Sequence, residues 1–180
     1  MNISEIYLHI RDIWFTFAAV LTNTVMFSSL TFKNFFGLSE AEMSQYKIHL
    51  AANNGCEEPL DVARRDFQEW VFWNRWRGGR GNNDFNREYI FGLIPLTDQP
   101  GKYVFGGIFK VIKRHDDWAD TEIGYDLELS DQLKELIGRL IVNFYREPMM
   151  GGRSFKMETL ADRMKVSAIL EDTYAVIRPS

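Results

Sequence analysis

The sequence predicts an α+β fold: a strongly bent, mostly antiparallel sheet or partial β-barrel with helices packed against it. Residues 89–114 form a β-hairpin pattern, and further strand-like segments alternate with short helical ones along the chain. A glycine pair, Gly106–Gly107, lies inside the second strand of the hairpin. Glycines within a strand mark a bulge, a sharp bend or a close approach of another group. We therefore expect this hairpin to be the centre of a bent sheet.

The hairpin consists of two runs rich in β-branched and aromatic residues, separated by the turn-forming residues 97–101. Pro100 presets φ for a turn, Gly101 permits a positive φ, and Asp98 can bond to its own backbone. Both faces of the second strand, residues 103–112, are largely apolar, which predicts burial on both sides.

Composition places the chain among ordinary globular proteins. It has 180 residues, of which 46% are hydrophobic and 26% charged, enough for one domain with its own core. The net charge of -4 gives no general attraction to nucleic acids. However, residues 64–114 contain ten Lys and Arg against five Asp and Glu, whereas residues 116–135 contain eight acids and one Lys. The single Cys56 excludes an intramolecular disulfide and a Cys-based zinc site.

The N-terminal region is unusual because residues 13–30 contain no charged side chain. This length would allow a membrane span, but its Thr, Ser and Asn residues lower the hydrophobicity. Glu5 and Asp12 argue against a signal peptide. We expect an N-terminal extension over residues 1–31, a single α+β domain over residues 32–180, and a cytoplasmic protein without membrane association. The extension is either a helix packed on the domain or a segment upstream of a natural start at Met26.

Local signals predict the remaining elements. Ser39 and Glu42 have capping-box spacing, which predicts a helix from Ser39 to the turn at residues 53–55. A second helix is expected from Pro59 to about Glu69, and its buried side would carry Leu60, Ala63 and Phe67. Further along we expect a polar loop at 115–121, strands at 123–129, 138–145, 154–159 and 164–170, a helix at 130–137 with Ser130 as N-cap, and a turn at 148–152.

No catalytic set is evident. The histidines, His9, His49 and His115, lie in different segments without partners at metal-ligand spacing. Residues 78–81 are glycine-rich but lack the Lys-Ser/Thr pair of a phosphate loop. Asp126 and Glu128 share one strand face, but no Lys follows at the spacing of a metal-dependent nuclease site. We expect no catalytic residues, no metal and no cofactor in this chain.

Residues 70–87 are the strongest functional candidate, because tryptophans and arginines alternate there before a Gly/Asn-rich loop. Arginines neutralise phosphates, planar aromatic rings stack on bases, and asparagines can read base edges. The alternative is that Trp70 and Trp73, three residues apart, face the core from one helical turn while the loop is simply solvated. The predicted nucleic-acid-binding residues are Trp73, Asn74, Arg75, Arg77 and Arg80, with further phosphate contacts from Arg139 and Arg146.

Five segments, FFGLSEAEMSQYKIHL, EWVFWN, GGIFKV, GYDLEL and IGRLIVNFYR, resemble the N-terminal domain of certain bacterial GIY-YIG nuclease family proteins. The resemblance spans about residues 32–174. Members of that family have a nuclease domain near the C-terminus, which needs GIY and YIG elements with an Arg and a Glu. Residues 123–125 read IGY, in a different order and without a second element at the required distance.

The resemblance therefore implies a DNA-binding accessory or specificity domain of a restriction or defence system, non-catalytic by itself. It also implies a PUA-like barrel, recognition of modified bases, and a nuclease domain or subunit as partner. The alternative class is a structural or protein-interaction domain. The sequence indicates neither the target base nor the oligomeric state.

Overall fold

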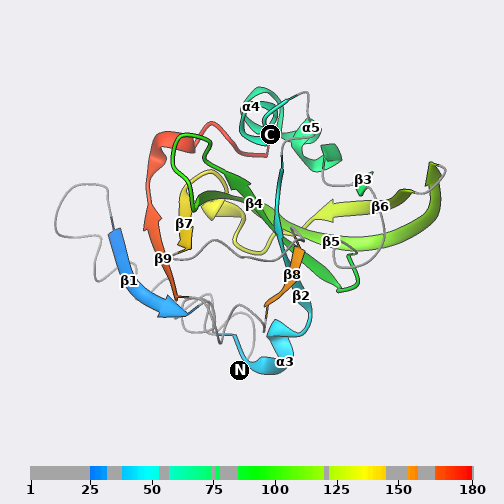
Figure 1. Ribbon diagram of the computed structural model, residues 1–180, viewed down its shortest axis with the longest axis horizontal. Coiled ribbons are helices and arrows are strands. Elements are labelled where there is room, and N and C mark those ends of the chain that lie inside the picture. The colour runs from blue at the N-terminus through cyan, green and yellow to red at the C-terminus, as the bar shows by residue number, and fades with distance from the viewer. Residues whose placement is uncertain are drawn as a thin grey trace.

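The computed structural model describes residues 25–31, 38–52, 57–73, 76–77, 85–119, 122–144, 154–157 and 165–179. It confirms the predicted α+β fold, with a bent, open sheet and a few short helices (Figure 1). The strands are β1 (Val25–Thr31), β2 (Tyr46–Leu50), β3 (Trp76–Arg77), β4 (Tyr89–Pro95), β5 (Lys102–Ala119), β6 (Glu122–Leu129), β7 (Leu140–Phe144), β8 (Ser154–Lys156) and β9 (Lys165–Leu170). The helices are α3 (Glu40–Met43), α4 (Pro59–Arg65) and α5 (Phe67–Trp73), with 3₁₀ turns η1 (Lys134–Leu136) and η2 (Asp172–Tyr174).

The described strands form one nine-stranded sheet in the order β1-β9-β7-β5-β4-β2-β8. The strand β6 lies beside β5, and β3 lies beside β6, off this path. Among the described pairs β2 and β4 run parallel, and the others are antiparallel. The sheet is therefore mostly antiparallel, as predicted.

The predicted hairpin is confirmed as β4 and β5, which pair from Tyr89 opposite Lys110 to Pro95 opposite Tyr103. At the turn, the Leu96 amide donates to the Lys102 carbonyl at 2.9 Å. Gly101 has a φ of +84°, in the left-handed region that glycine tolerates best. The turn chemistry of the sequence thus determines the register of the central pair.

The glycine pair is both a bulge and a close approach. Gly92 lies opposite Gly107 and Leu93 opposite Phe105, so Gly106 is the extra residue. The Trp70 indole N–H donates to the Gly106 carbonyl at 2.9 Å, and a Cβ on Gly106 would lie 2.8 Å from the Trp70 ring. A side chain at position 106 would therefore collide with a fully buried tryptophan.

The long strand β5 is buried on both faces only in its first part. Residues Val104 to Phe109 are buried, as predicted, but Lys110 and Ile112 are exposed. The prediction of a polar loop at 115–121 is wrong for the residues that the structure describes, because β5 continues to Ala119. There His115 lies opposite Gly124 and Ala119 opposite Glu122. Pairing with β6 keeps this charged stretch extended, although its composition is that of a loop.

The first predicted helix is much shorter than expected. The capping box is confirmed, since the Ser39 hydroxyl accepts from the Glu42 amide and the Glu42 carboxylate accepts from the Ser39 amide. The helix nevertheless ends at Met43, and residues 46–50 form the buried strand β2 instead. β2 pairs with β4 on one side and β8 on the other, so sheet pairing overrides the local helical pattern.

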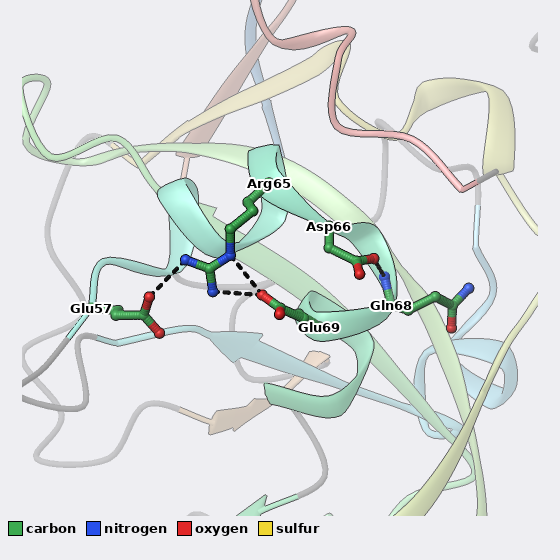
Figure 2. Close-up of polar contacts among 5 residues, drawn as sticks. All are labelled: Glu57, Arg65, Asp66, Gln68 and Glu69. Carbon is green, nitrogen blue, oxygen red and sulfur yellow. Dashed lines mark hydrogen bonds and ion pairs between the residues drawn. The ribbon is translucent and has the colours of Figure 1, made fainter.

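The second predicted helix is broken into α4 and α5 at Asp66, where the backbone is extended. Figure 2 shows the junction. The Arg65 guanidinium contacts Glu57 at 2.7 Å and Glu69 at 2.5 Å, and the Asp66 carboxylate accepts from the Gln68 amide at 2.8 Å. The latter bond satisfies a free amide of the first turn, as an N-cap does. The three residues predicted for the buried side, Leu60, Ala63 and Phe67, are buried.

Several remaining predictions are confirmed with shorter bounds. The strands β6, β7, β8 and β9 lie within or overlap the predicted segments, whereas the helix predicted at 130–137 is reduced to η1. The Ser130 hydroxyl accepts from the Gln132 amide at 3.2 Å, but Leu133 has a φ of +54°, which prevents a regular helix from continuing. The turn predicted at 148–152 lies outside the described residues.

Part of the predicted N-terminal extension belongs to the sheet. Residues 25–31 form β1, which pairs antiparallel with β9 from Val25 opposite Leu170 to Thr31 opposite Lys165. Residues 13–24 lie outside the described part of the chain. Within that part, no helix has both the length and the hydrophobicity needed to cross a bilayer.

Candidate nucleic-acid interface

The predicted binding segment begins at the end of α5, which is anchored in the core. Trp70 is 0% exposed and its ring packs edge-on against Phe109, with centroids 6.3 Å apart. Trp73, one turn later, is half-buried and packs against the same core. The inward-facing alternative therefore holds for Trp70, and Trp73 has only part of its ring available for stacking.

The short strand β3 follows α5 and joins the sheet through β6. Trp76 lies opposite Gly124 and Arg77 opposite Ile123, while Gly124 is in turn opposite His115 of β5. β3, β6 and the second part of β5 thus form a three-stranded unit, which we call the arm (residues 76–77, 110–119 and 122–129). Figure 1 shows β5 and β6 reaching away from the rest of the sheet, with β3 beside them.

The far end of the predicted segment is also fixed to the body of the protein. The Phe85 amide donates to the buried Tyr125 hydroxyl at 2.9 Å, and the two ring centroids are 5.0 Å apart. The Phe85 ring also meets His49 edge-on at 5.3 Å. Phe85, like Trp70, is therefore fixed by contacts with buried aromatic residues.

The described surface of the arm carries charges of both signs. Lys110 is opposite Glu128 and Lys113 is opposite Asp126. Two further pairs are direct contacts: Arg114 with Asp116 at 2.7 Å, and His115 with Asp126 at 2.9 Å. Arg114 and Asp116 both lie on β5, whereas the other three pairs join β5 to β6. Exposed pairs of either kind contribute only modestly to stability. The described side chains of the arm are not a basic surface by themselves, so a basic surface requires the arginines of residues 75–80.

The structure brings together only some of the predicted binding residues. Trp73 lies at the base of the arm, and Arg77 lies on it. The other predicted residues of this set lie outside the described residues: Asn74, Arg75, Arg80 and Arg146.

Arg139 lies elsewhere, between η1 and β7, where its guanidinium contacts Asp172 at 2.7 Å. The preceding residue, Gly138, donates its amide to Phe105 near the start of β5. Phe105 and His115 are ten residues apart on this strand, or about 33 Å if it were straight. Arg139 is therefore not part of the arm.

Lys110, Lys113 and Arg114 were not among the sequence-predicted site residues. They join the arm because β5 continues beyond the hairpin to pair with β6. The cation-rich run 110–114 was a visible signal, but only the pairing of β3 with β6 places it in the same three-stranded unit as Arg77.

The described residues contain no group of three or more His, Cys, Asp or Glu side chains arranged to hold a metal ion. Comparisons of the chain with models of protein families, with curated proteins and with solved structures found no match. The resemblance to GIY-YIG nuclease family proteins therefore stays a prediction from the sequence.

Proposed function

We propose that this chain binds DNA as a non-catalytic accessory or specificity domain, through the arm and the adjoining residues 73–80. The observation that supports this most is the pairing of β3 with β6, which places Arg77 in the same three-stranded unit as Lys113 and Arg114. Arg77 and the pair Lys113–Arg114 come from segments far apart in the sequence, and only strand pairing brings these segments into one unit. In the setting implied by the sequence resemblance, a nuclease domain or subunit would supply cleavage in a cytoplasmic restriction or defence system.

The mechanism of binding is electrostatic positioning followed by local contacts. The arginines would neutralise phosphates and release counterions, which makes affinity strongly salt-dependent. The exposed part of Trp73 could stack on a base, and Asn74 could read a base edge, including a modified one.

The test is a triple substitution, Arg75→Ala with Arg77→Ala and Arg80→Ala, measured by fluorescence anisotropy with a labelled duplex at two salt concentrations. Affinity should fall, and the log-log salt slope should flatten by about 0.9 for each lost phosphate contact. Arg178→Ala is the matched control, because it removes an exposed arginine away from the arm. Arg178 follows Ile177, whose backbone lies next to Gly138 near the start of β5. A triple variant that binds like the wild type would contradict the proposed surface.

Two single variants complete this test. Arg139→Ala reports whether the interface extends to the start of β7, away from the arm. Trp73→Ala separates stacking from packing: a stacking residue loses about 1–3 kcal/mol of binding free energy with unchanged melting. If Trp73 is instead a core residue, the substitution should lower the free energy of unfolding by about 3–5 kcal/mol.

A protein-interaction module is the second candidate, and the mixed charge of the arm favours it. Phe72 at the end of α5 is 59% exposed and Ile112 on the arm is 55% exposed, so apolar side chains are available among the charges. If the wild-type chain binds neither modified nor unmodified DNA at low salt, this second function replaces the first.

A further inference from the structure

A row of side chains crosses the sheet where the buried part of β5 ends. Tyr46 of β2 lies opposite Tyr89 of β4, Tyr89 opposite Lys110 of β5, and Lys110 opposite Glu128 of β6. Residues directly opposite on paired strands present their side chains on the same face of a sheet. The two tyrosines and the lysine are therefore neighbours on one face.

The aromatic end of this row is held rigidly. The rings of Tyr46 and Tyr89 are stacked, with centroids 5.3 Å apart and planes at 26°. The Tyr46 hydroxyl donates to the Gln132 side-chain carbonyl at 2.5 Å, and Tyr46 is buried while Tyr89 is only half-buried. Tyr46 thus supports the more exposed Tyr89 ring from the protein side. Burial raises the pKa of both hydroxyls, so both rings stay neutral in the physiological range.

Cations flank the exposed end of the row. Lys110 is exposed, and Lys113 is exposed further along β5. Arg87 precedes Tyr89 by two residues, and the Val111 amide donates to the Glu88 carbonyl at 2.9 Å, so strand pairing extends back towards Arg87. The Arg87 guanidinium donates to the carbonyl of Ser44, two residues before Tyr46. Lys110 is thus the cation directly opposite Tyr89, and Arg87 and Lys113 lie further along the two chain segments. Carboxylates are also present: Glu88 bonds to the Tyr89 hydroxyl, and Glu128 and Asp126 lie opposite the two lysines.

We propose that Tyr89, supported by Tyr46 and flanked by Arg87, Lys110 and Lys113, is a stacking platform for an unpaired base of single-stranded nucleic acid. This inference rests on the proposed function and names the kind of strand that binds. A neutral, pre-positioned ring beside cations is the combination that single-strand binders use: the ring stacks on any base and the cations contact the backbone. A duplex must unstack or flip out a base before it can stack on a side chain, so an unpaired stretch presents a base to Tyr89 at lower cost.

The experiment compares Tyr89→Leu with the wild type by anisotropy, using a labelled single-stranded oligonucleotide and the same sequence as a duplex. Removing the ring should weaken single-strand binding on the order of 5- to 100-fold and should affect duplex binding less. Tyr89→Phe keeps the ring and should restore the wild-type affinity. Lys110→Ala with Lys113→Ala should weaken single-strand binding and flatten its salt slope, by about 0.7 for each lost phosphate contact.

Tyr103→Leu is the matched control, because Tyr103 is another half-buried tyrosine of the same sheet, packed edge-on against Phe144 at 5.4 Å. It should change thermal stability without changing affinity. Equal single-strand binding by Tyr89→Leu and the wild type, with weaker binding by the Arg75/Arg77/Arg80 variant, would overturn the platform and leave the proposed function intact. A wild-type chain that binds neither oligonucleotide would overturn both.

Discussion

The two parts of β5 have similar apolar residues but opposite environments. In the first part, Val104 and Ile108 are 0% and 2% exposed, whereas Ile112 in the second part is 55% exposed. The first part has β7 and β4 as neighbours, and α5 covers it through Trp70. Beyond Lys110, β6 is the described strand that pairs with β5, and one further bond joins the Val111 amide to the Glu88 carbonyl. The neighbouring elements and the charged composition of residues 110–117 therefore both contribute to making the first part core and the second part surface.

The two parts of β5 also differ in support. The buried part pairs with β4 and β7, and the exposed part, which carries Lys110, Lys113 and Arg114, continues from it. Rigid support limits the conformational entropy lost when an exposed surface binds a partner.

The largest expected difference between the two parts is in core packing. Phe109→Ala removes a ring that is 0% exposed and should lower the free energy of unfolding by about 3–5 kcal/mol. Ile112→Ala, three residues later, should change it by no more than about 0.5 kcal/mol. Urea denaturation followed by tryptophan fluorescence measures both. Similar losses for the two variants would show that the second part of β5 is packed in solution.

The bulge should be the next most sensitive position. Gly106→Ala places a Cβ about 3 Å or less from several atoms of the buried Trp70 ring, and overpacking of this kind costs about 1–3 kcal/mol. A double-mutant cycle with Trp70→Phe sharpens the test. The smaller ring should make room, so Gly106→Ala should cost less in that background. A strictly additive cycle would contradict the contact.

At the boundary between the two parts, Tyr46 should make the free energy of unfolding depend on pH. Burial, followed by the nearby Tyr89, raises the pKa of Tyr46 from 10.0 to about 12. A raised folded-state pKa means that the unfolded chain loses its proton first. The contribution to stability is therefore complete below about pH 10 and is lost as the pH rises towards 12. Tyr46→Phe should remove this part of the pH dependence in denaturant titrations between pH 8 and 11. If Tyr46→Phe and the wild type have the same pH profile of stability, other groups cause the pH dependence.

The smallest stability effect is expected on the arm. Lys113→Ala with Arg114→Ala should change the free energy of unfolding by only about 0.5 kcal/mol per site, since both side chains are exposed. The same double variant should nevertheless weaken duplex binding and flatten its salt dependence. Loss of folding would show that these charges stabilise the arm, and unchanged affinity would remove β5 from the interface.

Local chemistry in the sequence determined several features of this protein. The turn residues and β-branched runs predicted the β4–β5 hairpin, Ser39 and Glu42 predicted the start of α3, and Gly106–Gly107 predicted an irregularity within β5. Each of these depends on residues close together in the chain. Turn and capping preferences act through bonds within a few residues, so they can be read without knowing the fold.

The tertiary structure decided the features that depend on distant partners. Residues 46–50 are a strand because β4 and β8 flank them, and residues 115–119 are a strand because β6 lies opposite. Likewise, strand pairing places Arg77 and Arg114 in the same three-stranded unit, whereas Arg139 lies outside it. Strand pairing joins residues far apart in sequence, and its free energy comes from burial and cross-strand contacts that no short segment encodes.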